Sequence, residues 1–398
     1  QQNHKPLKSH TSFWNRLLGG RMKVLLLDTA FSAMPIYDYL VAQGHDVWTM
    51  GNRPDDILAQ RAGDRWIEQD YSRVLEVGQH VKRIGIDCLV PGCTDVSMDT
   101  CVQLGTGRLD DAETNATLGN KRRFRALCAE LGLPAPRERD VSAFPVAGRF
   151  ICKPVDGFSG RGITVFDGED AEGVAAAFET ACRESSCGEA LAEPFVVGDL
   201  YSYTTFLEKG EPQDWFFVRE GSSINPFAVD TSYVSNALPE SCREVLADGV
   251  SRIADKLGLM DGLIHTQFIW DGQAPAIVEM ARRCPGDLYA LLIEYSTGFR
   301  YAAKYASYFL GERFDTAPTM RRHVLRHTVT SDERAVFGGL RFSETLPVKA
   351  FFPLRCLGEE LAGGHAGRAG VLFCEFGERD AMHLAEDRFL ARAVYEVG

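Results

Sequence analysis

A lysine followed by a glycine-rich loop is the first feature of the chain that could do chemistry. Lys153 stands at the end of the apolar run Phe150–Pro154, and glycines follow at positions 157, 160 and 162. Glycines let backbone N–H groups approach phosphate oxygens closely, and a lysine adds positive charge. The pattern indicates phosphate binding, although a flexible turn beside a solvated lysine would have the same sequence.

Two common nucleotide-binding motifs are missing from the sequence. There is no Walker A motif, and residues 29–33, which follow the first apolar run at 22–28, contain no glycine. A dinucleotide fingerprint needs glycines there for a tight turn and a close approach to the pyrophosphate. The sequence therefore disfavours a redox dinucleotide cofactor.

Five segments occur in a fixed order along the chain. They are Asn120-Lys121, Lys153 with its glycine loop, Glu193-Pro194-Phe195-Val196-Val197-Gly198, His265-Thr266-Gln267-Phe268, and Val278-Glu279-Met280-Ala281-Arg282-Arg283-Cys284-Pro285-Gly286. In order and spacing these segments resemble the ATP-grasp superfamily, over nearly all of residues 22–312. Tyr201-Ser202-Tyr203 resembles the amino-acid-ligase and carbamoyl-phosphate-synthase-like branches. The resemblance implies an ATP-dependent carboxylate-amine ligase.

The resemblance implies an ATP site in which Lys121 and Lys153 bind phosphates, each through charge-assisted hydrogen bonds of about 1.5–3 kcal/mol. Two solvated lysines are the alternative. Residues 157–162 would form a mobile loop that closes over the triphosphate and excludes water. The other expected cofactor-binding residues lie in this loop, at the adenine hinge and at the ribose: Ser159, Gly160, Gly162, Glu193, Phe195, Val196 and Asp199. Leu200 stands where many members have a ribose-binding glutamate, so Asp199 is only an adjacent substitute.

The resemblance also implies Mg²⁺, which prefers oxygen ligands at octahedral positions. Glu279 is the principal expected ligand, and Gln267 would coordinate through its amide oxygen. The third position of the pattern is Ala281, whose side chain has no oxygen. Either one metal is absent or another oxygen replaces the missing ligand. Asp287 is a candidate for this replacement because it is close in sequence.

Arg283 and Lys153 are the expected catalytic residues. The planar fork of Arg283 would steady the transferring phosphoryl group and the acyl phosphate. The implied reaction phosphorylates a small-molecule carboxylate, an amine then attacks the acyl phosphate, and ADP and phosphate leave. Packing explains Cys284 better than a nucleophilic role, because the spacing implies no His or Asp partner. His265 is similarly expected to support the site rather than act as a base.

Four residues are candidates for substrate contact. Thr94 and Asp95 follow a buried strand, and ligands of open α/β sheets bind beyond the carboxyl ends of strands. A capped turn before the next helix explains these two residues equally well. Arg282 and Asp287 belong to the segment at and after the last motif, where an arginine suits an anionic substrate, although Arg282 could instead be structural.

Three other functions stay open. Related folds carboxylate their substrates with bicarbonate, and such an enzyme would release ADP in a bicarbonate-dependent way. A non-catalytic ATP-binding protein would explain Ala281 and Leu200, and it would bind ATP without substrate-dependent turnover. A dehydrogenase is possible only if other residues compensate for the missing glycine fingerprint.

Alternating strands and helices must position these residues. Short apolar runs near residues 22–28, 47–50, 64–68 and 87–91 alternate with helical patterns, which predicts a doubly wound parallel sheet. Hairpin strands around the glycine loop predict a lid, and Glu240–Leu257 predicts an amphipathic helix. The predicted class is α/β, an ATP-grasp fold with a Rossmann-like N-terminal domain and a C-terminal α+β region. The expected divisions are a tail or extension at 1–21, the N-terminal domain at 22–115, the ATP-grasp domain at 116–312 with a lid at about 135–200, and the C-terminal domain at 313–398.

The composition of the chain limits which classes of partner it is expected to bind. The net charge of −12 and the lack of a Lys/Arg stripe argue against nucleic acid, and no apolar run reaches the 18 residues of a membrane span. The 11 cysteines are scattered and include no CxxC pair, which favours reduced thiols in a cytoplasmic protein. A homodimer is the common oligomer for soluble enzymes of this size.

Overall fold

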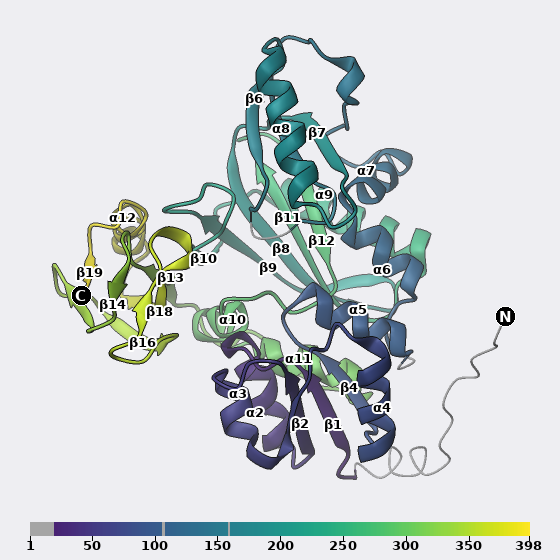
Figure 1. Cartoon of the computed structure of the whole chain (residues 1–398), viewed down its shortest axis with the longest axis vertical. Helices are drawn as coiled ribbons and strands as arrows, with labels where there is room; N and C mark the ends of the chain where they lie inside the picture. Colours follow the sequence, from purple (N-terminus) through teal and green to yellow (C-terminus); the bar gives the residue numbers. More distant parts are fainter. Residues whose placement is uncertain (1–19, 106–107, 158–159) are drawn as a thin grey trace.

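The computed structural model describes residues 20–105, 108–157 and 160–398. Nearly all of the predicted tail at residues 1–21 lies outside the described residues, as does Ser159 of the glycine loop. Figure 1 shows three parts arranged around a central sheet: the N-terminal part below, a small sheet with one helix above, and the C-terminal part to one side.

The N-terminal part is a four-stranded parallel sheet in the order β3-β2-β1-β4. Val24 and Leu26 of β1 pack with α2 on one face, whereas Leu25 and Leu27 pack with α4 and α5 on the other. This alternation confirms the predicted doubly wound sheet. The elements are β1 (Lys23–Leu27), α2 (Met34–Ala42), β2 (Asp46–Gly51), α3 (Ile57–Ala62), β3 (Trp66–Glu68), α4 (Val74–Ile84), β4 (Cys88–Pro91) and α5 (Asp95–Leu104), with the 3-10 turns η1 (Phe31–Ala33) and η2 (Gly63–Arg65).

The carboxyl edge of this sheet is closed by the chain's own side chains. A Cβ atom at Gly51 would lie 2.1 Å from Oγ1 of Thr29, and one at Gly92 would lie 2.2 Å from Cβ of Asp28. The Asp28 carboxylate also accepts a hydrogen bond of 2.8 Å from the backbone N–H of Cys93. Glycine at these two positions thus allows close packing within the protein, and the dehydrogenase alternative gains no support from them.

The upper part is a three-stranded antiparallel sheet in the order β6-β5-β7, with α8 packed against it (Figure 1). It has its own core, in which the rings of Phe150 and Phe166 stack at 5.9 Å between centroids. Two helices lead into it from the N-terminal part. The elements are α6 (Ala112–Gly119), α7 (Lys121–Glu130), the 3-10 turn η3 (Val141–Ala143), β5 (Arg149–Pro154), β6 (Thr164–Asp167), α8 (Ala171–Glu184) and β7 (Ala190–Pro194).

The central sheet has eight strands in the order β12-β11-β8-β9-β10-β13-β18-β16. One face is covered by α9, whereas α10 and α11 cover the other, and α11 also packs against α2 of the N-terminal part. A shared core therefore joins the N-terminal part to the central sheet. The elements are β8 (Asp199–Glu208), β9 (Glu211–Gly221), β10 (Thr231–Ser235), α9 (Glu240–Leu257), β11 (Gly262–Trp270), β12 (Pro275–Ala281), α10 (Tyr289–Thr297) and α11 (Tyr301–Leu310).

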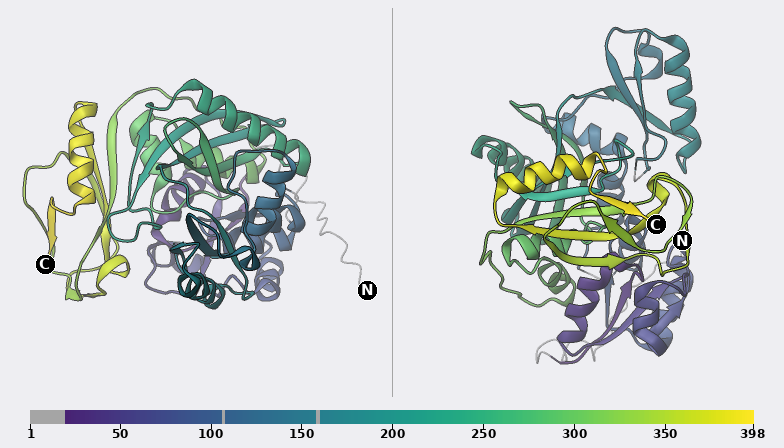
Figure 2. Two further views of the ribbon diagram at one scale, coloured as in Figure 1. Left: turned by 90° about the horizontal axis from the view of Figure 1, so that it is seen from above. Right: turned by 90° about the vertical axis from the view of Figure 1, so that its left-hand side faces the viewer.

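The C-terminal part extends this sheet. Its strand β13 pairs with β10 and with β18, so the sheet runs across the expected boundary between residues 312 and 313. Figure 2 shows α12 lying along this part of the sheet. The elements are β13 (His323–Thr330), β14 (Ala335–Val336), β15 (Leu340–Phe342), β16 (Val348–Pro353), β17 (Glu360–Leu361), η4 (Gly364–Ala366), β18 (Arg368–Phe376), α12 (Arg379–Leu390) and β19 (Tyr395–Val397). Within the described ranges, no helix is both long and apolar enough to span a membrane.

Candidate active site between the lid sheet and the central sheet

Lys153 lies at the end of β5 in a buried group of three charged side chains. Its Nζ donates a 2.5 Å hydrogen bond to Oε1 of Glu193 on β7. Nε of Arg125 on α7 donates to Oε2 of the same carboxylate at 2.7 Å. All three residues are at least 94% buried. The two cations outweigh the effect of burial and lower the pKa of Glu193 to about 2, so the carboxylate is ionised.

Sequence reasoning missed Arg125. The available signal was its position in α7, where it shares the buried side with Phe124 and Cys128. A charged residue at such a helix position needs a buried partner, because an unpaired charge in the interior is costly. The structure supplies that partner in Glu193, 68 positions away in sequence.

Lys121 begins α7 and holds the start of the glycine loop. Its backbone N–H donates to the carbonyl of Val155 at 2.8 Å, and its Nζ donates to the carbonyl of Gly157 at 2.5 Å. Farther along the loop, Gly160 has φ +71°, and a Cβ atom there would lie 2.7 Å from the carbonyl oxygen of Phe227. The loop therefore bridges the small sheet and the β9–β10 connection, and glycine is required at this contact.

The hinge between β7 and β8 contains the expected adenine and ribose residues. The N–H of Phe195 donates to the carbonyl of Arg149 at 2.9 Å, and the Arg149 guanidinium lies 4.7 Å from the Phe195 ring centroid. Val196 is partly buried, and Asp199 accepts a 2.7 Å hydrogen bond from Arg219. Because the Glu193 carboxylate holds Lys153 and Arg125, its predicted contact with the adenine amine stays a prediction.

Gln267 and Glu279 lie directly opposite each other in the β11–β12 ladder. A third oxygen-bearing residue, Glu220 of β9, accepts a 2.6 Å hydrogen bond from Nε2 of Gln267. Burial, with a contribution from the charge of Glu279, raises the pKa of Glu220 to about 7. Glu220 was missed because it carries no motif. The available signal was its position near the end of β9, shortly after the apolar run Trp215–Val218.

The donor set at these strands suits Mg²⁺. The described residues contain no group of three His, Cys, Asp or Glu side chains able to hold a metal, so an all-carboxylate cage is not available. The carboxylates of Glu279 on β12 and Glu220 on β9, with the Gln267 amide on β11, nevertheless provide the hard oxygen ligands that Mg²⁺ takes together with phosphates and water. Ala281 offers no side-chain oxygen, and Asp287 is bound to arginines instead, as described below.

Arg283 and Asp95, which were expected to contact the phosphoryl group and the substrate respectively, lie together. Nε of Arg283 donates to one oxygen of Asp95 at 2.6 Å and Nη2 to the other at 3.1 Å. Burial raises the pKa of the Asp95 carboxyl, but the nearby charge of Arg283 outweighs this effect, and the pKa is lowered overall. Thr94 caps α5, because its Oγ1 accepts a 3.1 Å bond from the N–H of Ser97. The capped-turn explanation therefore describes Thr94 in this structure.

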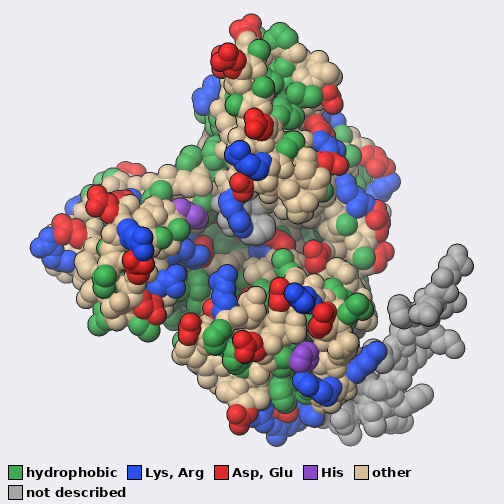
Figure 3. Space-filling model, in the orientation of Figure 1, with side chains coloured by type: hydrophobic (Ala, Val, Ile, Leu, Met, Phe, Trp, Pro, Cys, Tyr) green, Lys and Arg blue, Asp and Glu red, His purple; other side chains and the backbone are tan. Residues whose placement is uncertain are grey.

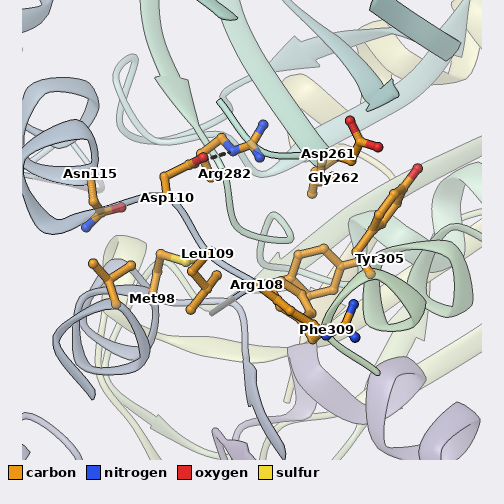
Figure 4. A pocket seen from close by; sticks show the side chains of 13 residues that line it. Met98, Arg108, Leu109, Asp110, Asn115, Asp261, Gly262, Arg282, Tyr305 and Phe309 are labelled. Carbon is orange, nitrogen blue, oxygen red and sulfur yellow. Dashed lines mark ion pairs between the residues drawn. The ribbon is translucent and has the colours of Figure 1, made fainter. Parts of the chain in front are cut away.

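Arg282 points into a different environment from Arg283. Its Nε lies 2.9 Å from Oδ2 of Asp110, and its Nη2 donates to the carbonyl of Met260 at 2.5 Å. Figure 4 shows this ion pair in the wall of a small pocket that Tyr305 and Phe309 also line. The pair ties the end of β12 to the segment after α5. The predicted substrate contact of Arg282 finds no support in this position.

His265 and Cys284, which were expected to support the site rather than react, are both buried. Burial and the nearby charge of Arg283 lower the pKa of His265 to about 3, so its ring is neutral. The Cys284 thiol is 99% buried against Cys93, whose pKa is raised by their mutual hydrogen bond and by burial. A thiol enclosed in this way is inaccessible to a substrate and is a poor nucleophile.

Charge interactions link these groups. The positive charge of Lys121 contributes to lowering the pKa of both Lys153 and Asp95, and the negative charge of Glu279 contributes to raising the pKa of both Arg283 and Glu220. The site thus runs from the small sheet to the central sheet. Figure 3 shows this face hollowed where the parts meet, with Lys and Arg side chains around the hollow.

Comparisons with known proteins match the fold. No protein-family model and no curated protein matches the sequence. An L-amino acid ligase from Bacillus licheniformis matches with a TM-score of 0.76 at 16% identity, covering 94% of this chain and 98% of that chain. Phosphoribosylglycinamide synthetase from Anaerococcus prevotii matches with a TM-score of 0.73 at 15% identity. The match covers 94% of this chain and 98% of that chain. A third match is the biotin carboxylase domain of Hydrogenobacter thermophilus 2-oxoglutarate carboxylase, in complex with MgADP, ADP and bicarbonate. Its TM-score is 0.75 at 14% identity, and the match covers 95% of this chain and 91% of that chain.

These structures are ATP-grasp enzymes, and each covers more than nine-tenths of the chain. The chain therefore has the ATP-grasp fold. This confirms the predicted fold class, from the N-terminal parallel sheet to the C-terminal strands.

Proposed function

We propose that this chain is an ATP-dependent ligase. It activates a small carboxylate as an acyl phosphate, joins it to an amine, and releases ADP and phosphate. The observation that carries the proposal is the grouping of Lys121, Lys153 and Arg283 near Gln267 and Glu279, where the small sheet meets the central sheet. Three cations beside an oxygen-lined strand pair match the needs of phosphoryl transfer, which depends on positioning and on neutralising charge.

Lys153 and Lys121 have different hydrogen-bond partners, which suggests different roles in binding phosphate. Lys153 is held by Glu193 and keeps a fixed position, suited to an inner phosphate. Lys121 bonds only to a loop carbonyl through Nζ among the described contacts, so it can exchange that bond for a phosphate oxygen as the loop closes. The proposed lid, residues about 135–200, contains this loop and would exclude water from the acyl phosphate.

Arg283 would stabilise the transferring phosphoryl group while Asp95 fixes its orientation. Mg²⁺ held by Glu279, Gln267 and Glu220 would neutralise phosphate charge and favour in-line transfer. Phe195, Val196 and Asp199 remain the proposed contacts for adenine and ribose.

The experiment that tests this function is ADP release with Mg-ATP. A panel of amino acids and other carboxylates is supplied with an amine pool, without it, and with bicarbonate. Carboxylate-dependent release, lost in Glu279→Gln and Arg283→Ala and retained in the surface variant Arg322→Met, supports the ligase. Release that needs bicarbonate would identify a carboxylase instead. ATP binding with no release under any condition would contradict both enzymes.

A further inference from the structure

The glycine loop begins beside a carboxylate, which is unexpected next to a phosphate site. Asp156 stands three residues after Lys153 and directly before Gly157, whose carbonyl accepts the hydrogen bond from Nζ of Lys121. A carboxylate free to turn toward a triphosphate would repel it, because like charges at short range oppose each other. Asp156 therefore belongs at this position only if its charge is held in another direction.

The Asp156 carboxylate turns toward the connection between α8 and β7, where two serines bind it. One oxygen accepts a 2.7 Å hydrogen bond from Oγ of Ser185, and the other accepts a 3.1 Å bond from the N–H of Ser186 and a further bond from its hydroxyl. Burial raises the pKa of Asp156, but its hydrogen bonds outweigh burial and lower the pKa overall. The carboxylate is therefore ionised, and donors of the protein itself hold its charge.

Further hydrogen bonds connect the same two segments through their backbones. Oγ of Ser185 accepts a 3.2 Å bond from the N–H of Glu189, and the carbonyl of Glu189 accepts a 3.2 Å bond from the N–H of Val155. The carbonyl of Val155 accepts a 2.8 Å bond from the N–H of Lys121. The start of the loop is therefore held by the α8–β7 connection on one side and by the first residue of α7 on the other.

The end of the loop lies against the same connection. A Cβ atom at Gly162 would lie 2.7 Å from Cβ of Glu184, the last residue of α8, and 2.8 Å from Cγ of Pro154. Gly162 also has φ +68°, a backbone conformation that favours glycine. Both described ends of the loop thus meet where α8 ends.

We propose that Asp156 is a positioning residue of the phosphate site. By binding Ser185 and Ser186, it sets the place from which the glycine loop starts, and it keeps its own charge away from the triphosphate. The inference rests on the nucleotide of the proposed function, and it adds a residue that sets the affinity for ATP without contacting it. A loop whose start is fixed before ATP binds loses less freedom on binding.

Equilibrium binding of a non-hydrolysable ATP analogue with Mg²⁺ tests this role without turnover. Asp156→Ala should weaken binding by about 5- to 30-fold, because part of the free energy of its charge-assisted hydrogen bonds is lost from the bound state. Asp140→Ala is the matched control. Asp140 accepts bonds of 2.8 Å from the N–H and 2.6 Å from the hydroxyl of Ser142, in the segment that leads into β5, and this variant should bind within about twofold of the unmodified chain.

Two further measurements separate positioning from a general loss of stability. Amide hydrogen exchange in Asp156→Ala should be faster at residues 155–157 and 160–162, whereas its midpoint in urea should match that of Asp140→Ala. Ser185→Ala should weaken binding in the same direction. The combined variant of Asp156→Ala with Ser185→Ala should bind no more weakly than Asp156→Ala alone, because both substitutions remove the same contact.

Several results would overturn the proposal. They are binding by Asp156→Ala within twofold of the unmodified chain, an equal loss in Asp140→Ala, and losses in Asp156→Ala and Ser185→Ala that add. Absence of analogue binding by the unmodified chain would overturn the positioning role together with the ATP site.

These outcomes are separable from those of the proposed ligase. A chain whose analogue binding depends on Asp156, but that never releases ADP, would keep the positioning role and lose the ligase. A chain that ligates with a KM for ATP unchanged in Asp156→Ala would keep the ligase and lose the positioning role.

Discussion

The carboxylate of Asp95 binds the guanidinium of Arg283 through two hydrogen bonds, although the residues are 188 positions apart in sequence. Asp95 lies in the first turn of α5 at the carboxyl edge of the N-terminal sheet, and Arg283 follows the end of β12. The pair therefore connects the N-terminal part to the proposed phosphoryl-transfer site, and it fixes the plane of the arginine.

Asp95→Asn should lower kcat for ADP release by about 10-fold, the low end of the range for a charge-assisted contact, because the Asp95 side chain is 55% exposed. Affinity for ATP should stay within about twofold, since we propose that Arg283 acts on the transferring group and that Lys121 and Lys153 hold the phosphates. Asp99→Asn on the same helix is the matched control. Steady-state kinetics giving an unchanged kcat, or an equal rise in KM for ATP, would show that the pair is only structural.

Glu193→Gln should destabilise the fold by about 3–5 kcal/mol, because it leaves Lys153 and Arg125 buried without their anion. Urea unfolding measures the change. Glu189→Gln, which removes an exposed partner of Arg122, should cost less than about 1 kcal/mol. Equal effects of the two substitutions would contradict the role of Glu193 as the anchor of the buried cations.

The same carboxylate predicts a pH dependence. The folded pKa of Glu193, about 2, is below the ordinary value of 4.5, so its contribution to stability is present above pH 4.5 and is lost as the pH falls toward 2. The stability difference between the unmodified chain and Glu193→Gln should therefore be constant above pH 4.5 and shrink below it. Denaturant titrations at several pH values measure this difference. If the stability difference between the two proteins grew as the pH fell, it would contradict the lowered pKa of Glu193.

Gly160→Ala should raise KM for ATP by about 5- to 30-fold, because the left-handed conformation costs an alanine about 1–2 kcal/mol. Its Cβ atom would also meet the carbonyl of Phe227, so the loop could not keep this contact. Gly188→Ala is a matched control, with φ +74° and open space around the position. If both variants bind ATP like the unmodified chain, the loop does not depend on this contact.

Much of the fold could be predicted because its elements have strong local patterns. The helix Glu240–Leu257 has the predicted bounds, and β5 differs from the predicted Phe150–Pro154 by one residue. The continuation of the central sheet into β13 could not be read from the sequence, because strand pairing between distant segments leaves no local pattern.

The site was predicted where residues belong to ordered motifs and missed where they do not. Lys121, Lys153 and Glu279 came from such motifs, whereas Arg125, Glu220 and Arg326 are buried charged residues that belong to none of them. Their burial and their partners depend on packing between elements, which leaves no local pattern. The predicted role of Asp287 as a replacement metal ligand has the same difficulty, because its partners are Arg326 and Arg368.

Carboxylate-dependent ADP release with Mg-ATP and an amine tests the central claim most directly. The account predicts that one class of small carboxylate stimulates release, that the acid and amine appear joined by mass spectrometry, and that Glu279→Gln and Arg283→Ala abolish both. ATP binding with no stimulated release and no joined product, across amino acids, other carboxylates and bicarbonate, would contradict it.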